Sequence, residues 1–473
     1  MATECTEAQY VFPWVDRRRV EARFNGGRLS SDGGAVLLRE VEAQRGLIRQ
    51  FATCFTDHRD ARRIEHSVES LLAQRIYALA LGYEDLNDHD ELRSDPLLAL
   101  VVGTRDLLGT QRARPRDQGC ALAGKSTLNR LELGAAVSGG EDRYRKITVE
   151  KEAVDRFLVD AFLQAHPEPP SEIVLDLDAT DDPVHGGQEE RFFHGYYGHY
   201  CYLPLYIFAG DFPLCARLRP SNIDASAGSV DEVARIVGQI RTHWPNVPVL
   251  LRGDAGFARE ALMAWCEGHE VDYLFGLARN ARLERWLAPS LSAAQQAFEA
   301  SGTAARIFAE RGYRTVTSWS QTRRVVGKAE WLAKGANPRF VVTSLAREAV
   351  DAQRLYEQVY CARGEMENRI KEQQLDLFAD RTSSSHFATN QLRLWCSTVA
   401  YLLVSELRRL GLKGTAWARA QCGTLRLKLL KIGAQIRVSV RRIRIALASG
   451  YPYEALFAQV YENLRRAPPP AVA

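Results

Sequence analysis

The sequence of 473 residues has no Cys-x-x-Cys pair and no apolar run near the ~18 residues that a membrane-spanning helix needs. Its nine cysteines are scattered, so their spacing predicts neither a disulfide framework nor a cysteine metal site. The first seven residues are polar and include two glutamates, which is not typical of a secretory signal. We therefore expect a cytoplasmic protein that does not enter a membrane.

A strong excess of one charge is also missing, because the formal net charge at pH 7 is only +4. A nucleic-acid-binding surface must then come from local clustering of basic side chains. Residues 406–445 provide such a cluster, with eleven Lys or Arg residues and one acid. Apolar residues at 432, 436, 440, 443 and 447 keep a helical period beside Arg437, Arg441 and Arg444. This pattern predicts a basic helix that contacts DNA phosphates.

The periodicity of the chain changes along its length, which allows about two or three domains. Residues 1–165 are typical of a mostly helical region. In residues 166–400, short apolar runs alternate with amphipathic segments, which favours a mixed α/β sheet with helices against it. We interpret residues 280–345 as a β-rich insertion and residues 401–473 as a basic helical region. Strands are expected at residues 173–177, 202–208, 212–218, 247–251 and 271–277, and helices at 229–243 and 259–267.

Carboxylates follow two of the expected strands. Asp176 and Asp178 end the first strand two residues apart, so they share one face of it. Asp254 comes shortly after the fourth strand. Carboxylates at the carboxyl end of a buried strand lie where α/β proteins usually form their sites. A close pair of carboxylates is costly unless a cation neutralises it, and oxygen ligands suit Mg²⁺ or Mn²⁺.

A charged helix face at residues 360–371 supplies a third carboxylate. Tyr360, Arg363, Glu367 and Lys371 fall at i, i+3, i+7 and i+11, which stacks them along one side of a helix. Three carboxylates can hold two divalent ions ~3.5–4 Å apart, as in-line phosphoryl transfer requires. A single strand-end aspartate is most often a turn or cap residue. The prediction of a two-metal site therefore depends on the joint pattern.

Two other patterns are weak. His194, His199 and Cys201 lie close in sequence but lack a fourth ligand, so they do not predict a zinc site. Residues 119–126 match the P-loop pattern. The polar segment before them is unsuited to the buried strand that a phosphate-binding loop must follow.

Three segments carry a family resemblance: Asp178–Gln188, Arg252–Phe257 and Arg363–Glu372. Together with residues 29–34, 82–88, 126–131 and 425–433, they resemble the bacterial insertion-sequence transposases of the DDE superfamily, group 1. The resemblance implies an RNase H-like catalytic domain that cuts element ends and joins 3′-hydroxyls to target DNA. It also implies double-stranded DNA as partner, both inverted repeats and target, with a homodimer on DNA that is associated with the nucleoid.

The resemblance implies roles for individual residues as well. Asp178, Asp254 and Glu367 match the catalytic, metal-binding carboxylates, with Asp176 as the alternative to Asp178. Tyr360 and Arg363 match the residues that steady DNA phosphates in the related signature. The N-terminal region is expected to recognise the element ends.

The chain departs from that signature at one position. The family's lysine lies seven residues after the glutamate, where this chain has Gln374, so Lys371 is the candidate substitute. Trp319 and Trp331 are candidates for the insertion aromatic that stacks on a flipped base in related enzymes. Two alternatives stay open: an RNase H-like nuclease that cuts without joining, and a DNA-binding protein whose catalytic centre has decayed.

Overall fold

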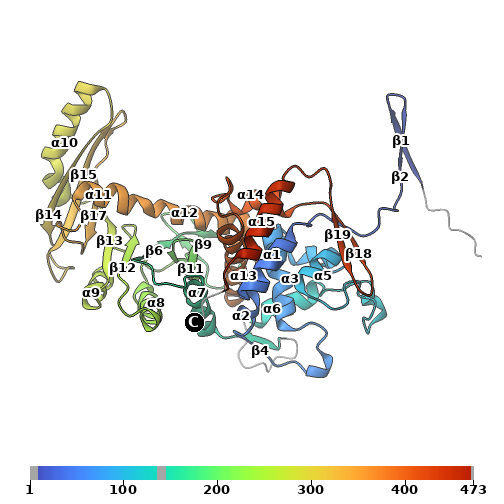
Figure 1. The fold of residues 1–473 in the computed structure, drawn as a ribbon. Helices are drawn as coiled ribbons and strands as arrows, with labels where there is room; N and C mark the ends of the chain where they lie inside the picture. The colour runs from blue at the N-terminus through green and yellow to red at the C-terminus, as the bar shows by residue number, and fades with distance from the viewer. Residues whose placement is uncertain (1–8, 136–144, 470–473) are drawn as a thin grey trace, which may run out of the picture. The chain divides into compact units, whose positions relative to one another are not determined.

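The computed structural model describes residues 9–135 and 145–469 and divides into two compact units (Figure 1). No helix within these described ranges has the length and apolar character needed to cross a membrane. Within the described residues, the first unit comprises 9–48, 59–131 and 403–467, and the second comprises 49–58, 132–135, 145–402 and 468–469.

The second unit is built on a mixed sheet of nine strands in the order β11-β10-β6-β12-β13-β17-β15-β14, with β16 paired to β15. The central strands β6, β12 and β13 are parallel neighbours, and β10 and β11 form an antiparallel hairpin beside β6. All five expected strands have counterparts here: β6 (Ile173–Ala179), β10 (Leu205–Ala209), β11 (Phe212–Arg217), β12 (Val249–Gly253) and β13 (Asp272–Leu277).

Burial explains why the central strands read as continuous apolar runs. Every residue of β12 is buried, as parallel strands covered on both faces must be. Helix α7 (Lys151–Ala165) packs against β11 and α8 (Ser229–His243), and α9 (Glu260–Gly268) packs against α8 and β13. The two helices predicted at residues 229–243 and 259–267 are therefore confirmed.

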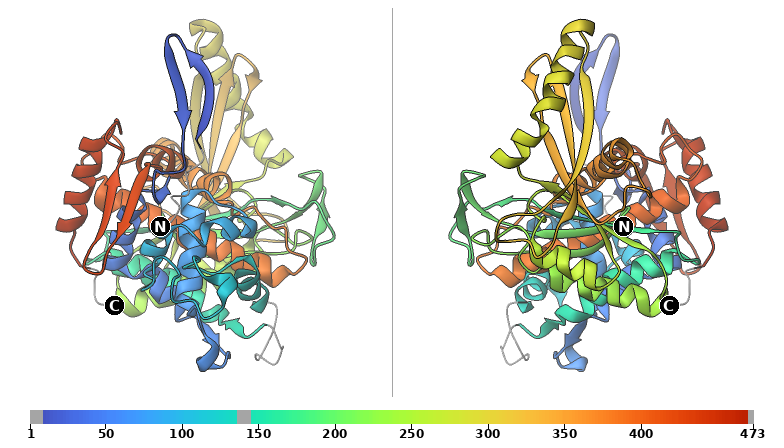
Figure 2. Two further views of the ribbon diagram at one scale, coloured as in Figure 1. Left: turned by 90° about the vertical axis from the view of Figure 1, so that its right-hand side faces the viewer. Right: turned by 90° about the vertical axis from the view of Figure 1, so that its left-hand side faces the viewer.

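The segment predicted as an insertion, residues 280–345, does not form a separate β-rich body. Its strands β14 (Ala305–Tyr313), β15 (Arg323–Leu332), β16 (Gly335–Ala336) and β17 (Arg339–Thr343) extend the central sheet, because β17 pairs antiparallel with β13. Helix α10 (Ala281–Ser301) lies along the long β14–β15 hairpin (Figures 1 and 2). The segment predicted as a β-rich insertion in the mixed-sheet domain thus adds its strands to the central sheet.

Several shorter elements complete the second unit. Strands β8 and β9 form a hairpin that pairs with β7 in a separate three-stranded sheet. The bounds are β4 (Phe55–Asp57), β5 (Ile147–Val149), β7 (Asp182–Pro183), β8 (Phe192–His194), β9 (His199–Tyr202), α11 (Ala352–Arg354), α12 (Gly364–Lys371) and α13 (Phe387–Glu406), which begins here.

The first unit is mainly helical but also contains β-hairpins. Helix α3 is almost wholly buried, and Ser67 caps its start by accepting a hydrogen bond from the amide of Ser70. The bounds are β1 (Tyr10–Val15), β2 (Arg18–Ala22), β3 (Leu29–Ser30), α1 (Ala35–Arg45), α2 (Leu47–Ala52, which begins here), α3 (Val68–Leu81), α4 (His89–Leu92), α5 (Pro96–Val102), α6 (Lys125–Gly134, which also begins here), α14 (Cys422–Leu425) and α15 (Glu454–Arg466).

The basic C-terminal segment is a β-hairpin rather than the predicted helix. Strands β18 (Ala434–Val438) and β19 (Ile443–Leu447) pair antiparallel, and β18 also pairs with β3. The apolar positions fit a helical period, but the segment alternates Ile and Val with polar residues and is rich in β-branched side chains. The helical period of the apolar residues favours a helix, whereas the β-branched side chains favour a strand. Pairing of β18 with β3 stabilises the strand.

Candidate functional site

Two aspartates lie at the same end of the central sheet. Asp178 is the penultimate residue of strand β6, and Asp254 directly follows β12. Since the two strands are parallel neighbours, with Gly253 paired to Leu177, they bring both carboxylates to one edge. The amide of Gly256 donates a hydrogen bond to Oδ1 of Asp254 at 2.8 Å, which fixes that side chain in its loop.

Arg363 connects the strand carboxylate to the helix carboxylate. Its Nη1 lies 3.4 Å from Oδ1 of Asp178, and its Nη2 donates to Oε1 of Glu367 at 2.5 Å. The side chains of Arg363 and Asp178 are 15% and 18% exposed and that of Glu367 is 42% exposed, so the contact with Asp178 is the more sheltered from water. The structure therefore brings Asp178, Arg363 and Glu367 together, and the contact of Arg363 with Glu367 agrees with their spacing on one helix face.

The electrostatics place all three carboxylates within range of one another. Burial raises the pKa of Asp178 to about 6, Arg363 opposes the shift, and the charges of Asp254 and Glu367 add to it. Mutual repulsion of this kind is relieved by a cation. The donor set is oxygen only, which fits Mg²⁺ or Mn²⁺.

The carboxylates do not converge as an assembled metal site would. Among the residues that the structure describes, no group of three His, Cys, Asp or Glu side chains is arranged to hold one ion. The Arg363 guanidinium instead supplies positive charge between Asp178 and Glu367. By chemistry the residues fit a divalent cation, and its binding would replace contacts that Arg363 now makes.

Tyr360 lies at the edge of the same site. A Cβ atom on Gly276 of β13 would lie 2.6 Å from the Tyr360 hydroxyl and 2.9 Å from the amide nitrogen of Ala255. Only glycine leaves room for the tyrosine to approach the loop that carries Asp254. Burial raises the pKa of Tyr360, with Arg363 opposing and Asp254 adding to the shift.

Asp176 is occupied by a different partner. Nε and Nη2 of Arg252 donate to its two carboxylate oxygens, each at 2.7 Å, and Nη1 of Arg252 donates to the carbonyl of Val359 at 2.7 Å. Asp176 is 5% exposed and Arg252 9%. This bidentate pair ties β6 and β12 to the segment that leads into the Glu367 helix, which is a structural role.

Gln374, which stands at the position of the signature's lysine, contacts the buried carboxyl of Asp182. Lys371 is exposed and has no polar partner among the described residues. Gln374 instead donates to Oδ1 of Asp182 at 2.9 Å and to the carbonyl of Asp181 at 3.2 Å. Asp182 is fully buried, and burial raises its pKa to about 8, with Gln374 opposing and Asp380 adding.

The helix that carries Glu367 is irregular at both ends. A π-helical turn, Leu355–Tyr360, precedes it, followed by one 3₁₀ turn, Cys361–Arg363. Helix α12 then holds Glu367, and a second π-helical turn, Glu372–Asp376, follows directly. Turns of this kind are frequent at functional sites. They interrupt the regular helical face that the sequence predicted, since Tyr360 lies in the first π-helical turn while Glu367 and Lys371 lie in α12.

The three predicted C-terminal arginines lie on the β18–β19 hairpin of the first unit. Arg437 pairs directly with Arg444 across the hairpin, and Arg441 is in the connecting turn. All three are exposed. Like charges opposite each other destabilise a hairpin, and phosphates would relieve that repulsion.

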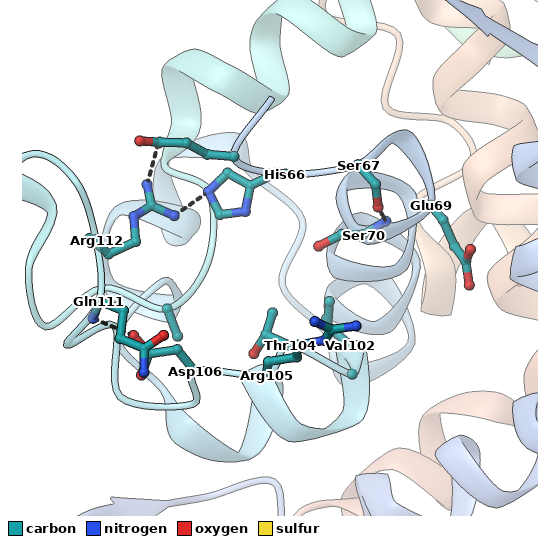
Figure 3. A pocket seen from close by; sticks show the side chains of 13 residues that line it. His66, Ser67, Glu69, Ser70, Val102, Thr104, Arg105, Asp106, Gln111 and Arg112 are labelled. Carbon is teal, nitrogen blue, oxygen red and sulfur yellow. Dashed lines mark hydrogen bonds and ion pairs between the residues drawn. The ribbon is translucent and has the colours of Figure 1, made fainter. Parts of the chain in front are cut away.

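The first unit also contains two adjoining polar cavities, of about 540 and 410 Å³. In the larger one, Nη1 of Arg112 lies 2.6 Å from Nε2 of His66, and its Nη2 donates to Oε2 of Glu65 at 3.0 Å (Figure 3). Burial lowers the pKa of His66 to about 4, and Arg112 adds to the shift. The smaller cavity is lined by five arginines: Arg93, Arg112, Arg114, Arg116 and Arg130. No residue predicted for the site lines either cavity.

Comparison with known families places this geometry in context. A family model described as the transposase DDE domain, group 1, matches residues 12–469. The chain belongs to this family. Membership confirms the resemblance to DDE transposases of group 1 and supports DNA transposase activity. No match was found among curated proteins.

Among solved structures, this DDE transposase family member is similar to a piggyBac transposase in a synaptic complex with hairpin DNA. The identity is 11%, the match covers 93% of this chain and 83% of that chain, and the TM-score is 0.40. So distant a likeness assigns no role to any residue.

Sequence reasoning missed three residues around the site of this transposase-family chain. Arg252, Asp182 and Gln374 each make buried polar contacts that hold neighbouring segments. Arg252 lies in the Arg252–Phe257 segment that carries the resemblance, and a charge inside an apolar strand was a signal that it needs a buried partner. Nothing in the sequence pairs Gln374 with Asp182.

Proposed function

We propose that this chain is a DNA transposase whose phosphoryl-transfer site is formed by Asp178, Asp254 and Glu367. The observation that carries the proposal is the bridge that Arg363 makes between Asp178 and Glu367, beside the loop of Asp254. A buried cation between carboxylates from a strand end and a helix is arranged for charged chemistry. Simple packing does not require it.

The residues would divide the work as follows. Asp178 and Asp254 would hold up to two Mg²⁺ or Mn²⁺ ions at the end of the sheet, with Glu367 completing the oxygen ligands from α12. When bound, such ions lower the pKa of an attacking water and neutralise charge on the transferring phosphoryl group. Arg363 would turn from Glu367 to a DNA phosphate, since a guanidinium binds either anion in a bidentate manner. Tyr360 would limit the movement of the DNA strand whose phosphate Arg363 binds.

The proposed reaction has two steps. First, a water oxygen attacks the phosphorus at the element end, the bond from phosphorus to the 3′-oxygen breaks, and that oxygen takes up a proton. Second, the freed 3′-hydroxyl loses its proton and attacks a phosphorus of target DNA, with release of a new 3′-hydroxyl. Both are in-line displacements that need positioning and charge stabilisation more than covalent catalysis.

The remaining assignments are finer proposals of the same kind. We propose an RNase H-like domain within residues 166–400 of a bacterial insertion-sequence transposase, acting in the cytoplasm as a homodimer on double-stranded DNA. Arg437, Arg441 and Arg444 would contact phosphates from the β18–β19 hairpin, which replaces the helix expected within residues 401–473. The arginine-lined cavity supports a role for the N-terminal region, residues 1–165, in recognising element ends.

A cleavage assay with Mn²⁺ tests the carboxylates. The substrate is a duplex that carries the inverted repeats flanking the reading frame. Asp178→Asn, Asp254→Asn and Glu367→Gln should each lower the cleavage rate by at least about a thousandfold, because several kcal/mol of charge stabilisation is lost. Glu365→Gln is the matched control, since Glu365 is an exposed acid on the same helix. Wild-type rates in Asp254→Asn and Glu367→Gln would falsify the catalytic assignment and favour a decayed DNA-binding protein.

A second assay separates the transposase from a nuclease that only cuts. Pre-cleaved end DNA with a free 3′-hydroxyl is mixed with supercoiled target plasmid and Mg²⁺. The proposal predicts joined products that disappear in Asp254→Asn. Cleavage of intact ends without joining would instead support the nuclease alternative.

A further inference from the structure

The β8–β9 hairpin exposes an unusual number of aromatic rings. Phe192, Phe193, Tyr196 and Tyr200 are 38%, 58%, 86% and 46% exposed. The hairpin projects from the second unit as a pair of green strands (Figure 2). Single exposed apolar residues are normal, but a group on one small element marks a binding surface.

The base of this hairpin is anchored next to the candidate catalytic strand. Strand β9 pairs with β7, which begins four residues after Asp178. Nε2 of His199 lies 2.8 Å from Oδ2 of Asp181, and the Ser221 hydroxyl donates to the carbonyl of Phe192 at 2.9 Å. One contact lies at each end of the hairpin, so its backbone is held in place while several rings stay exposed, and little order has to be gained on binding.

The connection between β8 and β9 lies at the end of the hairpin where His199 contacts Asp181. Tyr197 is in the connection between β8 and β9, and its ring centroid is 4.8 Å from that of His194 and 6.1 Å from that of His199. Burial raises the pKa of Tyr197 to about 12, and the charges of Asp181, Asp178 and Asp254 add to it. Because Asp181 follows Asp178 by three residues, the contact of His199 with Asp181 brings this end of the hairpin beside the end of β6 that carries Asp178.

The outer face combines rings with a cation. Phe193 and Tyr200 are paired across the hairpin, with ring centroids 5.7 Å apart in an edge-to-face arrangement. The guanidinium of Arg191 lies 4.7 Å from the centre of the Tyr200 ring. Aromatic faces that stack on bases and a nearby arginine for the backbone are the combination that binds single-stranded nucleic acid without sequence preference.

The tryptophan expected to stack on a base is not free to do so. Trp319 is 5% exposed and packs edge-to-face on Tyr313 at 5.6 Å, with Arg323 over its ring at 5.4 Å. Trp331 is half-buried on β15, where it pairs with Ala305. Exposed rings are present instead on the β8–β9 hairpin.

We propose that the β8–β9 hairpin is a stacking platform for unpaired bases of the DNA strand next to the phosphate that is cut. This inference rests on the proposed function of Asp178 and Asp254. Phe193 and Tyr196 stack on the bases, and Arg191 contacts the neighbouring phosphate. The platform stabilises strand ends that have separated, so it favours DNA that is frayed at the element boundary.

The test is a binding measurement in EDTA, so that it does not depend on cleavage. Two DNAs share one duplex sequence; one is blunt and the other has a three-nucleotide 3′ overhang containing 2-aminopurine. The wild type should bind the overhang DNA more tightly and quench the 2-aminopurine. The double variant Phe193→Ala/Tyr196→Ala should lose about tenfold in affinity for the overhang DNA, and keep its affinity for the blunt duplex.

Two controls keep the outcome informative. Tyr196→Phe retains the ring and should bind like the wild type. Tyr461 is an exposed tyrosine of the first unit whose ring centre lies 5.8 Å from the guanidinium of Arg465. Tyr461→Ala should leave the preference for overhang DNA intact. Both substituted rings are exposed, so folding should be unchanged, which circular dichroism verifies.

If the double variant lost the same affinity for both DNAs, or lost affinity for neither, the proposal of a stacking platform would be refuted. So it would be by a double variant that changes its oligomeric state in size-exclusion chromatography while it keeps the overhang preference, since the rings would then form a protein interface. Failure of the proposed function is seen separately, in the cleavage rate of Asp254→Asn. The two failures can therefore be told apart.

Discussion

The fully buried carboxyl of Asp182 has a measurable effect on stability, which Asp182→Asn isolates. Its pKa is raised from 3.8 to about 8 by burial, so the folded protein keeps this proton at neutral pH while the unfolded chain has lost it. The folded state binds more protons between these two values, and the free energy of unfolding must fall as the pH rises through that window. Asparagine has nearly the same shape as the neutral acid and can accept the same hydrogen bond from Gln374.

The size of the effect follows from proton linkage. Well below a folded-state pKa of about 8, each pH unit removes about 1.4 kcal/mol from the free energy of unfolding of the wild type. The slope weakens as the group itself begins to ionise, so the total loss between pH 6 and pH 8 is about 2 kcal/mol. Asp182→Asn has no such group. The stability of the variant relative to the wild type should therefore rise by about 2 kcal/mol over that interval.

Urea unfolding at pH 6, 7 and 8, followed by tryptophan fluorescence, measures this difference. Taking the difference between variant and wild type at each pH cancels the contribution of every other titrating group. Asp231→Asn, at an exposed position in the first turn of α8, is the matched control and should give a difference that does not change with pH. A constant difference for Asp182→Asn would refute the reasoning, because it would mean that Asp182 is ionised in the folded protein.

Three further predictions concern the surroundings of the site. Asp176→Asn should lower the free energy of unfolding by about 3–5 kcal/mol in urea titrations, because it leaves Arg252 buried without its carboxylate, and Asp176→Asn with Arg252→Gln should recover part of that loss. Arg363→Lys keeps the charge but cannot bridge two anions, so cleavage should fall by at least about tenfold with the fold intact by circular dichroism. Arg444→Ala should reduce the slope of log affinity against log salt by about one on any duplex, and an unchanged slope would exclude phosphate contact.

The parts of the second unit that could be predicted are those where local pattern and tertiary environment agree. Helix α8 has the bounds expected from its periodicity. Strand β12 is buried on both faces, which agrees with the continuous apolar run from which it was predicted. The proximity of Asp178 and Asp254 also followed from sequence, since parallel neighbouring strands must end at one edge. Arg363 and Glu367 lie one helical turn apart, so their contact is local.

The structure differs from the sequence-based expectations in segments whose conformation depends on contacts with residues far away in the chain. The β18–β19 hairpin satisfies both a helical and an alternating pattern, and its pairing with β3, some 400 residues earlier in the chain, favours the strand. Residues 280–345 contain strands β14–β17, but nothing local in the sequence shows that β17 pairs with β13 and so extends the central sheet. The contact between Gln374 and Asp182 depends on the same kind of distant partner.

The π-helical turns on either side of the Glu367 segment affect how spacing is compared between related chains. A π-helical turn holds one residue more than the α-helical turn it replaces. A chain can therefore gain or lose a residue within Glu372–Asp376 while the carboxylate of Glu367 stays where it is. The number of residues between the glutamate and a downstream polar side chain can then drift during divergence without moving either group in space. Alignments of this segment are better anchored on the position of a side chain in three dimensions than on a fixed interval in the sequence.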